Sequence, residues 1–154
     1  MSHIHLICLG KLKETFWREA EAEYLKRLSP YYKITIHELK EEGFSEKDSP
    51  EKVKQKEAEK IIAALEKIKT ENVIILDEHG KQYSSTELSD LLSPLADLVF
   101  IIGGPLGLDE KIIALSKNKI SLSKLTFTHQ MARVFLFEQI YRAAMIKVGK
   151  KYHY

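Results

Sequence analysis

The feature of this sequence that most constrains its fold is a set of short runs that are apolar on both faces of an extended chain. They are residues 3–9 (HIHLICL), 72–77 (NVIILD) and 97–102 (DLVFII). A strand that is apolar on both faces has to be covered on both faces, as strands of parallel sheets are. We therefore expect these runs to form a sheet with helices on each side.

Stretches with helical periodicity alternate with these strands. We expect helices over 14–28, about 51–68, from Ser84 to Leu91 or Leu92, 110–116 and 129–148, and further strands at 33–39 and within 118–128. Ser84 and Glu87 have the spacing of a capping box, and Asp109 precedes a short helix. Gly80 is expected to turn the chain, and the polar segment 41–50 to form a loop. The order predicts one α/β domain over 1–154 with a mostly parallel sheet.

Composition excludes several classes of protein. No run of about 18 apolar residues suggests a membrane span, and we expect no secretory signal at the N-terminus. The single cysteine, Cys8, cannot form an internal disulfide or by itself a metal site, so we expect no metal and a reducing, cytoplasmic location.

The formal net charge of +2 conceals a division along the chain. Residues 117–154 hold eight Lys and Arg but one acid, Glu138, giving +7, so the first 116 residues carry −5. Such asymmetry suggests a polyanion that meets the basic end. An unevenly spread surface charge is the other interpretation, and charge alone does not decide between them.

Three expected strands end in segments that suit a binding site. Leu76-Asp77 precedes His79-Gly80, Ile102 precedes Gly103-Gly104-Pro105-Leu106-Gly107, and a short strand precedes SKLTF. The carboxyl ends of parallel strands meet at one edge, where ligands of α/β proteins bind. The glycine segment is not a dinucleotide fingerprint, and it is also consistent with a tight turn only.

The last helix, 129–148, is apolar nearly all round, so it has to be buried on most sides. We expect one flank to meet the sheet and another to meet a second subunit. His129 and Arg133 lie on one side and Glu138 and Arg142 on the other, and each pair has the i,i+4 spacing of interacting side chains. The tail KKYHY combines cations and aromatic rings suited to nucleic acid, or is simply a frayed terminus.

Taken together, the segments LDEHGKQYSSTEL, FIIGGPLGLD, SLSKLTFTHQMARVFLFEQIYRA and the terminal YHY closely resemble the bacterial RlmH family, and ICLGKLKE and the length agree. These are large-subunit ribosomal RNA methyltransferases of the SPOUT class. The resemblance implies an α/β fold with a deep C-terminal trefoil knot, over roughly 72–154, and a homodimer. It implies methylation of N3 of a pseudouridine in helix 69 of 23S rRNA, on assembled ribosomes, with S-adenosylmethionine as donor.

The resemblance also assigns site residues. The implied cofactor pocket comprises Leu76, Gly103, Gly104, Gly107, Leu122, Ser123, Lys124, Leu125, Thr126 and Phe127. The implied catalytic residues are His129, Arg142, Tyr152 and His153, and the implied RNA contacts are Arg133, Lys150, Lys151 and Tyr154. Thr128 stands where many members of the family have proline.

These residue types suit the reaction. N3 of pseudouridine is a protonated imino nitrogen, so its proton has to be removed before it can attack a methyl group. His129 and His153 are candidates to take that proton, and Arg142 to stabilise the developing anion. Tyr152 and His153 are candidates to close over a flipped nucleotide. Two alternatives remain open from the residues themselves: a non-catalytic ribosome-associated factor, and a small-molecule α/β enzyme that binds a nucleotide.

Overall fold

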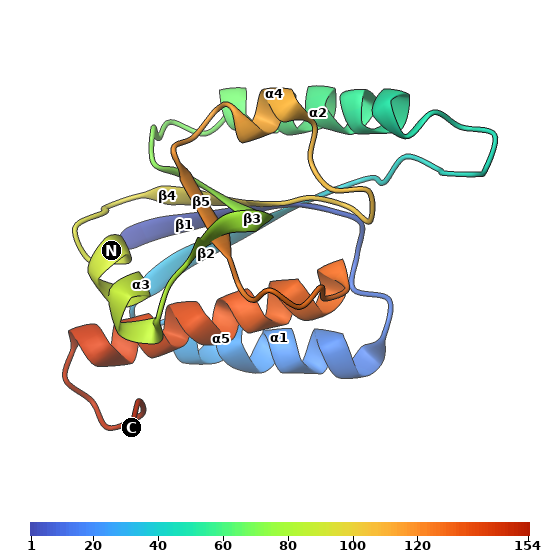
Figure 1. Cartoon of the computed structure of the whole chain (residues 1–154). Coiled ribbons are helices and arrows are strands. Elements are labelled where there is room, and N and C mark those ends of the chain that lie inside the picture. Colours follow the sequence, from blue (N-terminus) through green and yellow to red (C-terminus); the bar gives the residue numbers. More distant parts are fainter.

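The computed structural model describes residues 1–154 and contains one five-stranded, fully parallel sheet. The strand order is β2-β1-β4-β3-β5 (Figure 1). The central strand is β4, which lies between β1 and β3. The strands are β1 (Ser2–Leu9), β2 (Tyr32–Leu39), β3 (Val73–Gln82), β4 (Leu98–Ile102) and β5 (Asn118–Ser121). The expected parallel sheet is confirmed.

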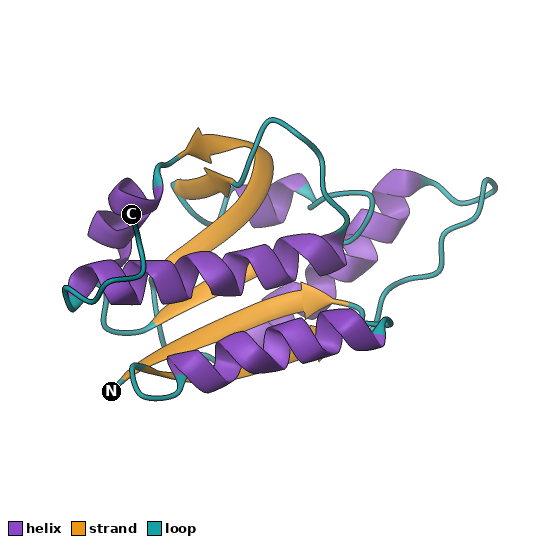
Figure 2. Cartoon of the chain, turned by 90° about the horizontal axis from the view of Figure 1, so that it is seen from below, coloured by secondary structure: helices purple, strands orange, loops and turns teal.

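Helices cover both faces of this sheet, as the apolar strands require (Figures 1 and 2). They are α1 (Thr15–Leu28), α2 (Pro50–Glu66), α3 (Ser85–Leu92), α4 (Glu110–Ile113) and α5 (His129–Lys147). The helices α1, α3 and α5 enclose the larger core, around Phe100 and Phe137. The helices α2 and α4 enclose a smaller core on the opposite face, around Ile7 and Ile101. No helix has the length and apolarity needed to cross a membrane.

Local signals at the helix starts act as expected. Ser84 and Glu87 form the full capping box of α3: the Glu87 N–H donates to Ser84 Oγ (3.1 Å), and the Ser84 N–H donates to Glu87 Oε2 (2.7 Å). Asp109 caps α4 by accepting from the Lys111 N–H at 2.9 Å. These caps satisfy backbone donors that the first helical turn leaves free.

The expected turn at Gly80 is wrong, because β3 continues through Gly80 to Gln82. Ile120 of β5 pairs first with Leu76 and again with Lys81, so the intervening residues bulge out of the ladder. A Cβ on Gly80 would lie 2.7 Å from the carbonyl carbon of Lys119, a distance that backbone cannot relieve. Glycine is needed here for close strand contact and not for a turn.

Candidate functional site

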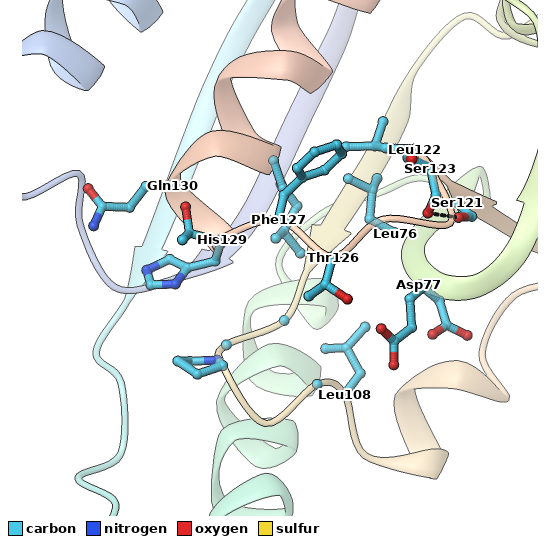
Figure 3. Close-up of a pocket in the computed structure, with 18 of the residues that line it drawn as sticks. Leu76, Asp77, Leu108, Ser121, Leu122, Ser123, Thr126, Phe127, His129 and Gln130 are labelled. Carbon is cyan, nitrogen blue, oxygen red and sulfur yellow. Dashed lines mark hydrogen bonds between the residues drawn. The ribbon is translucent and has the colours of Figure 1, made fainter.

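The expected pocket exists at the edge of the sheet where the strands end. A cavity of about 700 Å³ is enclosed by the segment after Leu76, the loop after β4, the loop after β5 and the first turn of α5 (Figure 3). The residues that line it are Leu76, Asp77, Glu78, Ile102, Gly103, Gly104, Pro105, Leu106, Gly107, Leu108, Ile120, Ser121, Leu122, Ser123, Leu125, Thr126, Phe127, Thr128, His129, Gln130 and Ala132. The volume suits a ligand of nucleoside size.

Two glycines give the loop after β4 its shape. Gly107 has a φ of +81°, and its N–H donates to the Gly104 carbonyl at 3.0 Å, which closes a tight turn. A Cβ on Gly103 would lie 2.8 Å from Cγ of Leu108. At Gly103, Gly104 and Gly107 the loop therefore lines the cavity with backbone atoms, beside the side chains of Pro105, Leu106 and Leu108.

The loop after β5 is fixed by its own polar side chains. Ser121 Oγ donates to the Ser123 carbonyl at 2.9 Å, and the Leu125 N–H donates to Ser123 Oγ at 3.0 Å. Thr128 begins α5 by accepting from the Met131 N–H at 3.3 Å. A threonine cap therefore supports the start of α5.

One residue predicted for the pocket lies outside it. Lys124 is exposed and does not line the cavity, because the Ser121 and Ser123 hydrogen bonds turn the loop there. All the other residues predicted for the pocket line the cavity. Several further lining residues were not predicted as cofactor contacts. Asp77 is one of them, although it directly follows Leu76 at a strand end that the sequence analysis had identified.

The charged residues that line the cavity are all acidic. Asp77 and Glu78 are the only Asp, Glu, Lys or Arg residues in its lining. Asp77 stands near Thr126 and Leu108, whereas His129 and Gln130 lie at the other end (Figure 3). The cavity therefore favours a ligand with net positive charge.

His129, which lines the cavity, has an unsatisfied polar atom. Its Nε2 is buried and has no hydrogen-bond partner. A buried polar atom without a partner costs free energy unless a ligand or a water supplies one. The residue lines the cavity, but its Nε2 is not exposed to it in this structure. The i,i+4 interaction expected between His129 and Arg133 is not formed.

The other three predicted catalytic residues gather around Glu138. The expected pair is confirmed: Arg142 Nη2 donates to Glu138 Oε1 at 2.6 Å. Arg142 Nη1 lies 3.2 Å from His153 Nδ1, and the Tyr152 hydroxyl donates to Glu138 Oε1 at 3.1 Å. The hydrogen bond to Glu138 raises the pKa of Arg142. Burial and the hydrogen bond to Glu138 raise the pKa of Tyr152 to about 12.

His129 and the residues gathered around Glu138 lie toward opposite ends of α5. His129 is the first residue of the helix and Arg142 follows 13 positions later, which corresponds to about 20 Å along the axis at 1.5 Å per residue. Figure 1 shows the C-terminal tail at the end of α5 far from the loop after β4. One chain therefore does not bring the predicted catalytic residues together.

The prediction that Arg133 contacts RNA needs correction. Arg133 is only 5% exposed; it donates to Glu21 through Nε and Nη2 and to Glu38 Oε2 through Nη1 at 2.7 Å. Burial lowers the pKa of Arg133, but these carboxylates outweigh it and the pKa ends above its ordinary value. Nη1 also contacts Cys8, whose thiol pKa burial raises to about 11. Arg133 joins α5 to α1 and β2.

The remaining predicted RNA contacts are accessible. Lys151 and Tyr154 are exposed, and Tyr154 is 98% exposed. Lys150 is also exposed, although its Nζ donates to the Tyr31 hydroxyl at 2.8 Å. Phe135 is the large apolar side chain of α5 left most open, at 36% exposure, and it packs edge-on against Phe127.

A sheet-edge cavity on this α/β fold is the arrangement of a methyltransferase of the SPOUT class, and comparison with known proteins agrees. The model of the family described as "Predicted SPOUT methyltransferase" matches residues 2–153, so the chain belongs to that family. It is 41% identical to the ribosomal RNA large subunit methyltransferase H of Pelotomaculum thermopropionicum, over 100% of both chains.

Two further relatives are also named ribosomal RNA large subunit methyltransferase H. The protein from Symbiobacterium thermophilum is 41% identical, over 97% of this chain and 98% of its own length. The protein from Clostridium novyi is 45% identical, over 98% of this chain and 99% of its own length. The resemblance identified in the motifs therefore extends over the full chain.

Proposed function

We propose that this chain is a homodimeric, S-adenosylmethionine-dependent methyltransferase of large-subunit ribosomal RNA. It methylates N3 of a pseudouridine in the helix 69 loop of 23S rRNA, on assembled ribosomes in the cytoplasm. The rRNA substrate is supported by the names of the full-length relatives. The pseudouridine, its N3 position and the ribosomal context are what the resemblance of the combined motifs to the RlmH family implies.

The observation that carries the proposal is the charge of the cavity. S-adenosylmethionine bears a sulfonium, an ammonium and one carboxylate, so it is a net cation. Asp77 and Glu78 suit it, and the open backbone at Gly107 suits a flat adenosine. A nucleotide would place its phosphates in a lining with no Lys or Arg. This disfavours the small-molecule enzyme that binds a nucleotide, and a non-catalytic factor needs no such cavity.

The split of the predicted residues supports a composite site. The tail group around Glu138 and the cavity at His129 are about 20 Å apart along α5 of one chain. In a dimer with two-fold symmetry, each tail can meet the cavity of the partner subunit, so two equivalent sites form. The exposed Phe135 of α5 is consistent with a second subunit against this helix.

The donor supplies an electrophilic methyl group, and the protein has to position the base and remove its proton. His153 Nδ1 faces the Arg142 guanidinium, which only donates, so Nδ1 accepts and Nε2 carries the hydrogen. With its pKa near 12, the Tyr152 phenol stays protonated at neutral pH. Both side chains then present donors to the base.

His129 is therefore our candidate to accept the N3 proton. The residue lines the cavity, and its Nε2 is buried and has no hydrogen-bond partner, so a small shift of the ring would let it reach the bound base. Arg142 stabilises the charge that develops on the base as the proton leaves. Lys150, Lys151 and Tyr154 contact the surrounding RNA, through phosphates and by stacking. Arg133 is left out of this surface because it is buried.

We also propose that residues 72–154 contain the trefoil knot of the SPOUT class. The supporting observation is the contact at Gly80, where β3 lies so close to the backbone of β5 that no side chain fits between them.

The experiment that tests the function is methyl transfer from labelled donor to ribosomes that contain or lack pseudouridine at the target site. We expect labelling only where pseudouridine is present. Equal labelling of both ribosome samples contradicts the substrate. For the proton step, pH–rate profiles of His129→Ala and His153→Ala are compared. We expect a loss of about 10²- to 10⁴-fold for His129→Ala, as for a general base. Wild-type rates in His129→Ala would exclude His129 as the acceptor of the N3 proton.

A further inference from the structure

Glu57 is a buried carboxylate that the proposed reaction does not use. It is 4% exposed and lies on the inner face of α2, four residues after Val53 and four before Ile61, both of which are buried. The position fits an apolar side chain in the helical pattern. Burial raises the pKa of Glu57, although a hydrogen bond from the Glu42 N–H opposes the shift.

No cation forms an ion pair with Glu57, and the nearby Lys60 offsets its burial only in part. Lys60, one turn further along α2, donates to Glu42 Oε1 at 2.7 Å and to the Lys40 carbonyl at 2.8 Å. The hydrogen bond to Glu57 is the Glu42 N–H, at 3.3 Å from Oε2. A buried carboxylate with so little compensation costs folding free energy that leucine at the same place would not. A carboxylate at this position therefore calls for a role other than stability.

The contacts of Glu57 indicate that role. A Cβ on Gly104 would point at the carboxylate, 3.5 Å from both oxygens. Gly104 also lines the donor cavity, so Glu57 supports the outer side of a loop whose inner side meets the ligand. On its other side Glu57 accepts from the backbone of Glu42. A second cavity, of about 380 Å³, separates segment 41–44 from Pro105 and Leu106, and Glu57 lines it.

We propose that Glu57 is a positioning residue, which stands between the 103–107 loop and the 41–44 segment, fixes the position of both and so sets the donor cavity for binding. The two segments belong to connections that leave different strands, β2 and β4, at the same edge of the sheet. Figure 1 shows the loop after β2 extending from this edge next to α2. The affinity part of the inference rests on the proposed function, because it takes S-adenosylmethionine as the ligand.

The test compares Glu57→Leu, Glu57→Gln and the control Glu59→Leu, whose residue is exposed on the same helix. Calorimetry measures the Kd for S-adenosylhomocysteine, and urea unfolding measures stability. We expect Glu57→Leu to weaken binding about tenfold, the size of one lost hydrogen bond to a charged group. Its stability should equal or exceed that of wild type. Glu57→Gln, which keeps an acceptor for the Glu42 N–H, and Glu59→Leu should stay within about threefold of wild type.

Each outcome decides the inference. Wild-type affinity in Glu57→Leu overturns it, and so does an affinity loss that only follows lost stability. If the wild-type protein binds no S-adenosylhomocysteine, the proposed function fails, and amide exchange without ligand then decides the loop contact. Faster exchange at 41–44 and 103–107 in Glu57→Leu, with wild-type exchange in Glu57→Gln, supports the positioning role. Unchanged exchange in Glu57→Leu refutes it.

Discussion

The composite site predicts a specific pattern of activity in mixed dimers. One subunit has its cavity filled by Thr126→Trp, a position that lines the cavity. The other ends at Lys151 and so lacks Tyr152, His153 and Tyr154. With cavity and tail about 20 Å apart along α5, each variant alone should be inactive as a homodimer.

The expected magnitude follows from the two-fold arrangement. In the heterodimer one composite site combines the two damaged parts, and the other combines an intact cavity with an intact tail. A purified, doubly tagged heterodimer should therefore have about half the wild-type activity, and a randomly assorted mixture about one quarter. If each site instead uses the cavity and tail of one chain, the heterodimer has no intact site.

A reciprocal control separates the two arrangements. Both changes are placed in one subunit, which is paired with a wild-type subunit. The composite arrangement leaves this dimer without an intact site, whereas sites within one chain would retain about half the activity. The assay is methyl transfer to ribosomes at saturating donor, with the dimeric state checked by light scattering. Activity in the control and none in the first heterodimer would refute the composite site.

Further expectations concern the supports of the site. Glu21→Ala should lower the free energy of unfolding in urea by up to about 3–5 kcal/mol because it leaves the buried Arg133 charge with Glu38 as its only carboxylate partner, whereas Glu21→Leu combined with Arg133→Met should recover most of the loss. Gly80→Ala should cost about 1–3 kcal/mol by overpacking against β5 in the same assay. Asp77→Asn should weaken binding of cationic S-adenosylmethionine about fivefold in calorimetry, a charge energy of ~1 kcal/mol near water, but not that of neutral S-adenosylhomocysteine. Because the pKa of Glu57 is raised above its ordinary 4.5, the folded protein keeps this proton to higher pH than the unfolded chain, and the free energy of unfolding should fall as the pH rises above 4.5. Glu57→Gln should flatten that fall in urea unfolding measured between pH 4 and 7.

The sequence predicted those parts of the fold that depend on local pattern. Apolar runs located the strands, and the Ser84 and Glu87 spacing located a helix start. The strand-end argument brought Leu76, Gly103 and Leu122 to one cavity although they are distant in the chain. Each of these predictions needs only the periodicity of a few residues and the rule that parallel strands end at one edge.

The errors concern residues whose environment is set by distant parts of the chain. Arg133 is indistinguishable in sequence from a surface cation, because Glu21 and Glu38 lie 112 and 95 residues away. Gly80 has the composition of a turn, but its role depends on the backbone of Lys119 and Ile120. Lys124 lies between two predicted pocket residues, yet the hydrogen bonds of Ser121 and Ser123 decide where the loop turns.

The distribution of charge gives a reason for dividing the site between two chains. An acidic cavity favours a cationic donor and repels phosphates, while the basic tail attracts them, so neighbouring positions in one chain would oppose each other. Because the tail lies at the far end of α5, the basic tail and the acidic cavity of one chain stay apart until the proposed dimer forms. In the composite site that we propose, backbone phosphates meet Lys150 and Lys151, and only an uncharged base enters beside Asp77. The −5 and +7 parts of the sequence then serve different ligands, and the proposed dimer brings them together at one methyl group.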